Sequence, residues 1–147
     1  MTDELTPQQL AERTVAGMLE TDAASRALGM TLAAVGPGHA TVTMPVRDDM
    51  LNGFGICHGG LITALADSAF AFACNSYGEL TVAAGLVVDF LAPARAGDVL
   101  TAQCTEVALT GRTGVYDAEV LKQDGTRIAV FRGRSYRVRP RPNGPPV

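Results

Sequence analysis

The spacing of apolar and polar residues changes along this chain and divides it into helical and extended segments. At the start, Thr6 and Pro7 precede apolar positions that recur with the helical period and end near Glu20. Thr6 is a typical N-cap, proline is favoured in the first turn, and Gln9 would close a capping box. The pattern predicts an N-terminal helix, followed by a short helix capped by Asp22.

The longest apolar stretch lies in the middle of the chain. From about Gly59 to Tyr77 the residues are apolar nearly all round a helical wheel, and Gly78 is a typical terminating glycine. Other elements must enclose such a helix on most sides. Its apolar run is short for a membrane span and contains Asp67, which favours a buried helix over a transmembrane one.

The remaining segments alternate with a period of two, which predicts strands. One strand, around residues 42–46, precedes the long helix, and four strands follow it. The apolar run at 82–91 is suited to a central strand, and Asp124-Gly125 is a strong two-residue hairpin signal. Four or five antiparallel strands curling round one apolar helix form the α+β arrangement that this order favours.

Length and composition fit one globular domain. With 147 residues, 47% of them hydrophobic and 18% charged, the chain can build a substantial core. We expect a single domain over residues 1–138 and a disordered tail over 139–147. The first residues lack the apolar core of a signal peptide, so the expected location is the cytoplasm. The three cysteines do not have the spacing of metal ligands.

Charge is unevenly distributed. The net charge of −3 argues against a general polyanion binder, yet the residues after Thr110 carry +5 and the rest of the chain −8. This basic segment could contact phosphates, or it could be an ordinary solvated strand face with a basic tail; the pattern alone favours neither.

Asp67 is the only charged residue between Asp49 and Glu79. A carboxylate in apolar surroundings is costly unless it is paired, hydrogen-bonded or neutralised. A turn of sequence His58-Gly59-Gly60 stands where the same helix begins. A carboxylate and a free helix N-terminus are the groups needed to attack an acyl carbonyl and hold the resulting oxyanion. The pair therefore indicates acyl transfer to water.

Helix geometry limits how these two groups could work together. Gly59 and Asp67 are eight residues apart, about 12 Å along a helix axis, and only the first turn has free N–H groups. One chain cannot present both to one carbonyl, but two antiparallel helices about a two-fold axis could. This predicts a dimer in which Asp67 is general base or nucleophile and Gly59 N–H binds the oxyanion. Asn52 and His58 would orient the carbonyl or the water.

Structural interpretations of the same residues remain open. Asp67 could be hydrogen-bonded to a neighbouring group, and a histidine beside a Gly-Gly turn is more often a structural hydrogen-bonder than a catalyst. Gly59 could simply permit a tight entry into the helix, and Asn52 with the following glycine is also a generic turn. Cys57 beside His58 suggests a thiol hydrolase only weakly, because adjacent side chains seldom point at one atom.

These residues resemble the hotdog-fold acyl-CoA thioesterases, and within them the phenylacetic acid degradation (PaaI) subgroup. The resemblance covers roughly residues 40–138. The motifs that carry it are Asn52, His58-Gly59-Gly60, Leu65-Ala66-Asp67, Val88–Pro93 and Gly97-Asp98, and for the subgroup Ala69–Ser76, Thr113–Asp117 and Phe131–Gly133.

The resemblance implies a curved antiparallel sheet round a central helix, with an N-terminal helix, a homodimer and usually a homotetramer. It implies that Asp67 is the base or nucleophile and Gly59 the oxyanion donor, with His58 and Asn52 assisting from the partner chain. The substrates it implies are phenylacetyl-CoA and its ring-hydroxylated relatives, with no metal or organic cofactor, no nucleic acid and no membrane. Three basic residues could then cradle the coenzyme A phosphates: Arg112, Arg132 and Arg134.

The resemblance is incomplete at one point, and two other functions stay open. Some related enzymes place a hydroxyl residue on the strand after the helix, whereas residues 82–85 offer none and only Thr81 precedes them. A non-catalytic acyl-CoA binding module would share the fold. A hotdog enoyl-CoA hydratase would need a histidine–carboxylate pair, and the chain contains only His39 and His58.

Overall fold

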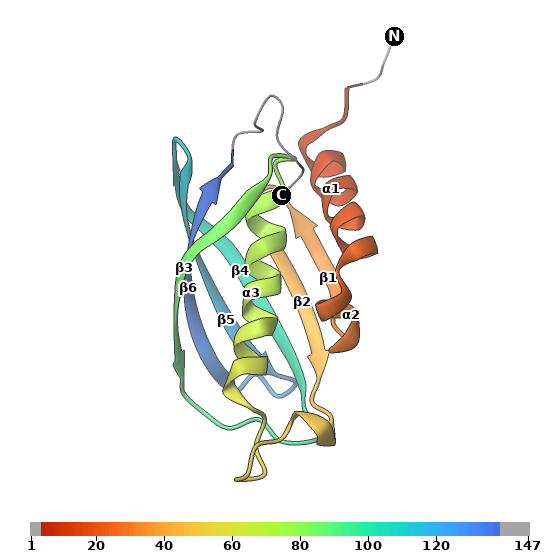
Figure 1. Ribbon diagram of the computed structural model, residues 1–147, viewed down its shortest axis with the longest axis vertical. Helices are drawn as coiled ribbons and strands as arrows, with labels where there is room; N and C mark the ends of the chain where they lie inside the picture. Colours follow the sequence, from red (N-terminus) through yellow and green to blue (C-terminus); the bar gives the residue numbers. More distant parts are fainter. Residues whose placement is uncertain (1–3, 139–147) are drawn as a thin grey trace.

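The computed structural model of the protein describes residues 4–138 and shows an antiparallel sheet curved around one long helix (Figure 1). The sheet has six strands in the order β1-β2-β4-β5-β6-β3. The bounds of the strands are β1 Thr31–Gly36, β2 His39–Pro45, β3 Thr81–Phe90, β4 Val99–Thr110, β5 Thr113–Lys122 and β6 Arg127–Arg137. The predicted tail at 139–147 lies outside the described residues.

The helices begin where the sequence signals predict. Thr6 caps the first helix, where its Oγ1 accepts from Gln9 N–H at 3.2 Å and its own N–H donates to Gln9 Oε1 at 2.9 Å. The predicted capping box is therefore confirmed. None of the helices described between residues 4 and 138 is long and apolar enough to cross a membrane. The helical segments are α1 Pro7–Thr21, α2 Ala23–Ala27, the short 3₁₀ helix η1 Asp48–Met50 and α3 Gly59–Asn75.

The core lies between α3 and the concave face of the sheet. The ring of Phe70 in α3 packs edge-on against Tyr116 of β5 and tilted against Phe131 of β6, with ring centroids 5.5 Å and 5.6 Å apart. A side chain at Gly133 would collide with the Phe70 ring, so glycine allows the helix to approach β6 closely. The helix α1 packs beside α3 and β1 (Figure 1), so the sheet and α1 together cover most of the apolar helix.

Strand β1 was not predicted, so the sheet has six strands rather than four or five. Its residues Ala33 and Ala34 are both exposed, and its pairing register with β2 shifts between Leu32 and Ala34. A bulge of this kind breaks the two-residue alternation on which the prediction of a strand depends.

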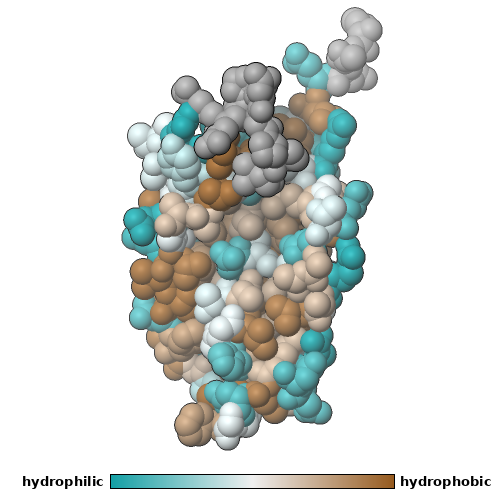
Figure 2. All heavy atoms as spheres, in the orientation of Figure 1, coloured by the Kyte–Doolittle hydropathy of each residue, from teal (hydrophilic) through white to brown (hydrophobic). Residues whose placement is uncertain are grey.

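Strand β3 is an edge strand, and the prediction of a central strand is wrong for the single chain. Its apolar side chains remain exposed, with Val87 at 65% and Phe90 at 54% of their full accessible surface. Figure 2 shows hydrophobic atoms gathered on the flank of the molecule where β3 lies. A continuous apolar run indicates that both faces of a strand are covered, but it does not say which chain covers them.

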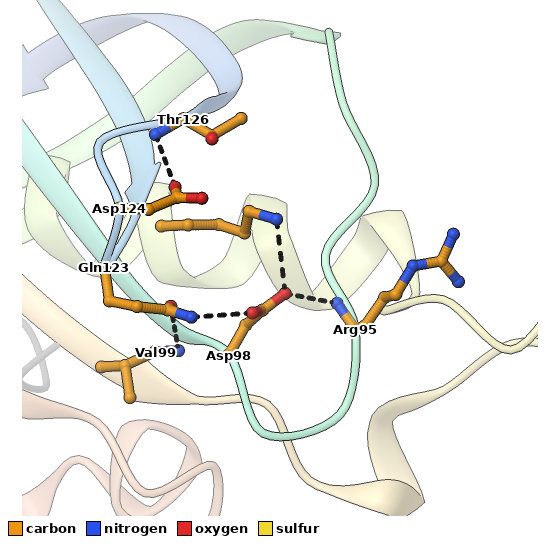
Figure 3. Close-up of polar contacts among 7 residues, drawn as sticks. Arg95, Asp98, Val99, Gln123, Asp124 and Thr126 are labelled. Carbon is orange, nitrogen blue, oxygen red and sulfur yellow. Dashed lines mark hydrogen bonds and ion pairs between the residues drawn. The ribbon is translucent and has the colours of Figure 1, made fainter.

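Asp98 connects the loop between β3 and β4 to the β5–β6 hairpin through hydrogen bonds and an ion pair (Figure 3). Its Oδ2 accepts from Arg95 N–H at 2.8 Å and lies 3.9 Å from Lys122 Nζ, and its Oδ1 accepts from Gln123 Nε2 at 2.9 Å. The Arg95 N–H bond, followed by the Gln123 bond, holds the pKa of Asp98 below its usual range. The anchored loop then supplies Ala94 C=O, which accepts from Cys57 N–H at 2.7 Å just before α3.

Candidate active site

The N-terminus of α3 leaves one backbone donor free. His58 is the N-cap, because its Nδ1 accepts from Gly60 N–H at 3.1 Å. The next two N–H groups, those of Leu61 and Ile62, donate to His58 C=O at 2.9 Å and 3.3 Å. Within residues 4–138 no acceptor faces Gly59 N–H. The helix dipole and this free donor therefore provide a place for a carbonyl oxygen that becomes negative.

Gly59 opens onto a cleft of about 500 Å³. A Cβ added at Gly59 would lie 2.9 Å from the Phe90 ring, so any larger residue here would have to displace that ring. The sequence predicted an oxyanion donor at Gly59, and the structure adds that the absence of a Cβ there makes room for the Phe90 ring. The residues that line the cleft are Asn52, Ile56, Cys57, Gly59, Ile62 and Phe90–Pro93.

Asn52 holds the loop before α3 in shape. Its Oδ1 accepts from Phe54 N–H at 2.9 Å and from Ile56 N–H at 3.3 Å, so it has the turn-forming role that the sequence left open. Its Nδ2 has no hydrogen-bond acceptor in the described part of the chain, and Asn52 lines the same cleft as Gly59. The amide can therefore hold the loop with its oxygen and donate to a ligand with its nitrogen.

His58 is first of all a capping residue. Because its Nδ1 accepts the Gly60 N–H, the imidazole proton of this tautomer lies on Nε2. The side chain is exposed, so Nε2–H remains available as a donor to a ligand. The structural interpretation of His58 agrees with this geometry, and a part in catalysis stays a prediction.

Asp67 lies on the outer face of α3, away from the sheet. Its side chain is half-buried, and burial raises the pKa of its carboxyl group. Between residues 4 and 138 it has neither a hydrogen-bond donor nor an ion-pair partner, so the structural alternative of a carboxylate bonded to its neighbours finds no support. It opens on a hollow of about 250 Å³ between α3 and the α1–α2 segment.

The structure separates the two halves of the predicted site within one chain. Gly59 and Asn52 line the cleft beside β3, whereas Asp67 lines the hollow beside α2. This separation agrees with the helix-length argument, since about 12 Å along the axis divides positions eight residues apart. One chain brings Asn52, His58 and Gly59 together and leaves Asp67 elsewhere.

The three arginines named for the coenzyme A phosphates are unequally suited to that role. Arg132 forms a bidentate ion pair with Asp117 at 2.6 Å and 2.7 Å, and Arg112 donates to Tyr136 Oη at 2.9 Å. Arg134 has no such partner among residues 4–138, but its guanidinium lies over Gly85 of β3. Arg132 and Arg134 alternate with the buried residues of β6, which places them on the sheet face opposite α3.

The sequence interpretation missed Arg95, which follows the cleft-lining Pro93 by two residues. Its backbone N–H is bound by Asp98, while its guanidinium extends away from that contact (Figure 3) and has no partner in the described segment. The preceding Pro93 is a turn signal in the sequence, and it could have drawn attention to Arg95. No three His, Cys, Asp or Glu side chains within residues 4–138 are grouped to hold a metal ion.

An antiparallel sheet curved around one long helix is the arrangement of the hotdog fold, and comparison with known proteins places the chain among the thioesterases of that fold. The model of the thioesterase superfamily matches residues 54–129 of this chain. The acyl-coenzyme A thioesterase PaaI of Escherichia coli K12 is 47% identical over 121 residues, which are 82% of this chain and 86% of that protein.

Solved structures show the same relationship. The structure of the E. coli PaaI protein from the phenylacetic acid degradation operon superposes with a TM-score of 0.89 at 44% identity, covering 90% of this chain and 96% of that one. A Streptococcus mutans UA159 protein bound to acetyl CoA superposes with a TM-score of 0.72 at 27% identity, covering 74% and 88%. The chain therefore belongs to the thioesterase superfamily. The predicted hotdog fold, the resemblance to the PaaI subgroup and the prediction of a thioesterase are confirmed.

Proposed function

We propose that the protein hydrolyses phenylacetyl-CoA or hydroxyphenylacetyl-CoA thioesters to the free acid and coenzyme A. The observation that carries this proposal is Asp67, a half-buried carboxylate without a partner among residues 4–138, on the helix whose Gly59 N–H is free. A purely structural carboxylate would be expected to have a hydrogen-bond partner when it is half-buried. The choice of phenylacetyl and hydroxyphenylacetyl as acyl groups follows from the PaaI relatives, one of which belongs to a phenylacetic acid degradation operon.

The site requires a second copy of the chain. The exposed apolar residues on the edge strand β3 favour pairing of β3 with the same strand of a partner. A two-fold axis at that edge would set the two α3 helices antiparallel and bring Gly59 of one chain toward Asp67 of the other. We propose this homodimer, its pairing into a homotetramer and a cytoplasmic location as the setting of the enzyme.

Hydrolysis then needs only groups of the two chains and one water. Asp67 takes a proton from water, and the hydroxide attacks the thioester carbonyl carbon, whose oxygen becomes negative and is bound by Gly59 N–H of the other chain. Asn52 Nδ2 and His58 Nε2–H beside that Gly59 orient the carbonyl. The tetrahedral intermediate collapses and expels coenzyme A as its thiolate. Direct attack by Asp67 through a mixed anhydride uses the same contacts.

Thiol release from a panel of acyl-CoA substrates tests the proposal. We expect kcat/KM for phenylacetyl-CoA and hydroxyphenylacetyl-CoA to exceed the values for short and long aliphatic acyl-CoAs. Comparable turnover of aliphatic substrates would remove the aryl-acetyl assignment and keep the thioesterase. Tight binding without thiol release would instead support a non-catalytic module, and hydration of an enoyl-CoA would support a hydratase.

The pH dependence of hydrolysis should report the burial of Asp67. The base is active only when ionised, so kcat/KM should be low at acidic pH and rise to a plateau as pH passes the pKa of the free enzyme. Because burial raises that pKa, the midpoint should lie above the ordinary value of about 3.9 for aspartate. A pH–rate profile, with circular dichroism confirming the fold at each pH, measures it; a midpoint at or below the ordinary value would contradict this role.

Arg95 is expected to bind a phosphate of coenzyme A. Changing Arg95→Gln should raise KM for an acyl-CoA by about 10- to 100-fold, the loss expected for one charge-assisted hydrogen bond, with kcat nearly unchanged. The same variant should not change KM for the matching acyl-pantetheine, which lacks the nucleotide phosphates. Arg13→Gln, at an exposed position of α1, is the matched control. An equal change in KM for both substrates would exclude the phosphate contact.

A further inference from the structure

A chain of hydrogen bonds links the short helix α2 to α3 beside Asp67. Ser25 Oγ donates to Asp22 Oδ2 at 2.7 Å and lies 2.9 Å from Ser68 Oγ, although Ser25 and Ser68 are 43 residues apart. Ser25 N–H also donates to Asp22 Oδ1 at 2.9 Å. Only 2% of the Ser25 surface is exposed, so these bonds are largely protected from water. We call Asp22, Ser25 and Ser68 the hydroxyl chain.

The protons in the hydroxyl chain can run in only one direction. An ionised carboxylate accepts hydrogen bonds and donates none, so Ser25 uses its single hydroxyl proton toward Asp22. The bond between the two serines must then be donated by Ser68. The single hydroxyl proton of Ser68 is therefore used in the bond to Ser25, and only the lone pairs of Ser68 Oγ remain for other partners. Toward anything else in its surroundings, Ser68 is an acceptor.

Ser68 and Asp67 line the same hollow. Its other walls are mostly apolar, with Met18, Leu28 and Met30 from the N-terminal segment on one side and Phe72 of α3 on the other. Methionine side chains adapt to the shape of an apolar ligand. The small residues Ala64 and Ala71 of α3 leave the space open between these walls. Asp22 and Ser25 also line the hollow, and both carboxylate oxygens of Asp22 already accept hydrogen bonds from Ser25. The hollow thus combines a mainly apolar lining, the oriented acceptor Ser68 Oγ and the carboxylate proposed to start hydrolysis.

We propose that this hollow holds the acyl group of the thioester and that Ser68 Oγ accepts a hydrogen bond from a donor on that group. A hydroxyl on an aromatic ring meets this requirement, because it donates a proton while the ring contacts the apolar walls. A methoxy group at the same ring position has no proton to donate and would leave two acceptors facing each other. Ser68 is therefore a specificity-determining residue, set in its orientation by Asp22 and Ser25. The inference rests on the proposed thioesterase function.

The test compares kcat/KM for phenylacetyl-CoA with the values for its 3-hydroxy, 4-hydroxy and 4-methoxy derivatives. We expect one hydroxy derivative to be preferred over the unsubstituted compound by roughly 2- to 10-fold, the effect of one hydrogen bond, and the methoxy derivative to be disfavoured. Ser68→Ala should bring the ratio of hydroxy to unsubstituted substrate close to one. Ser25→Ala frees the Ser68 proton for donation, so it should improve the methoxy substrate relative to the hydroxy substrate.

The ratios of kcat/KM between substrates distinguish an effect on acyl-group recognition from an effect on folding, because misfolding lowers the activity toward all substrates alike. Thr101→Ala, a half-buried position on the opposite face of the sheet, is the matched hydroxyl deletion and should leave every ratio unchanged. A Ser68→Ala variant that slows all four substrates alike would show a structural role and overturn the inference, as would unchanged ratios. Either result leaves the thioesterase itself intact. Absence of thiol release from every substrate by the unaltered protein would instead overturn the proposed function.

Discussion

Replacing Asp67 with asparagine is expected to lower kcat for thioester hydrolysis by about 10²- to 10⁴-fold, the usual contribution of a general base. Asparagine has nearly the same shape, but it neither takes a proton from water nor attacks a carbonyl. The same change should leave thermal stability equal or slightly higher. Burial raises the pKa of Asp67, so the folded state disfavours its charged form at neutral pH, and a neutral side chain removes that cost.

Activity and stability together make this experiment decisive. Thiol release measures kcat, and a melting curve followed by circular dichroism shows that the variant is folded. Asp48→Asn makes the same chemical change at an exposed position in the short 3₁₀ helix, and it should affect neither quantity. Loss of both activity and stability in Asp67→Asn would identify a structural carboxylate. Activity within a few-fold of the unaltered protein would exclude Asp67 as base and as nucleophile.

The fold could be predicted where local chemistry decides the structure. Short-range geometry that residue type reveals decides three features. These are the capping box at Thr6 and Gln9, the start of α3 at Gly59 and the hairpin near Gly125. The hairpin connection spans residues 123–126 rather than two residues. Within it, Gly125 N–H donates to Lys122 C=O and Thr126 N–H donates to Asp124 Oδ1, each at 2.9 Å.

Strand positions within the sheet could not be predicted in the same way. Strand β3 has the composition of an interior strand and stands at the edge of the single chain. In the proposed homodimer, the same strand of a second chain would cover these apolar residues. For β1, the bulge between Leu32 and Ala34 removed the periodic signal altogether.

The same division applies to the candidate site. Asp67 and Gly59 could be recognised because a lone charge in an apolar helix and a glycine at its first turn are visible in the sequence. The partners of the other groups were not visible. Asn52 Oδ1 is occupied by two loop N–H groups, and Arg132 is held by Asp117 across two strands. Pairings of this kind depend on tertiary contacts, which the order of residues does not reveal.

Mixing two inactive variants should restore about a quarter of the activity if each site combines two chains. Asp67→Asn removes the carboxylate, and Gly59→Pro removes the oxyanion donor while keeping a residue that is favoured in the first helical turn. In a heterodimer, one site lacks both groups and the other is complete. Random reassortment makes half of the dimers heterodimers, each with one working site of two. The two variants are unfolded together, refolded, and assayed for thiol release.

Steric and assembly effects require their own controls in this experiment. The proline ring would meet Phe90, whose ring lies 2.9 Å from the position that a Cβ at residue 59 would occupy, so Phe90→Leu is placed in both chains to give it room. Each variant refolded alone should stay inactive while keeping its dimeric mass. Recovery only on mixing requires that Asp67 and Gly59 act across the interface, because neither chain by itself holds both. No recovery from a mixture that demonstrably contains heterodimers would mean that each chain completes its own site, and the separation of the cleft from the hollow would then require another explanation.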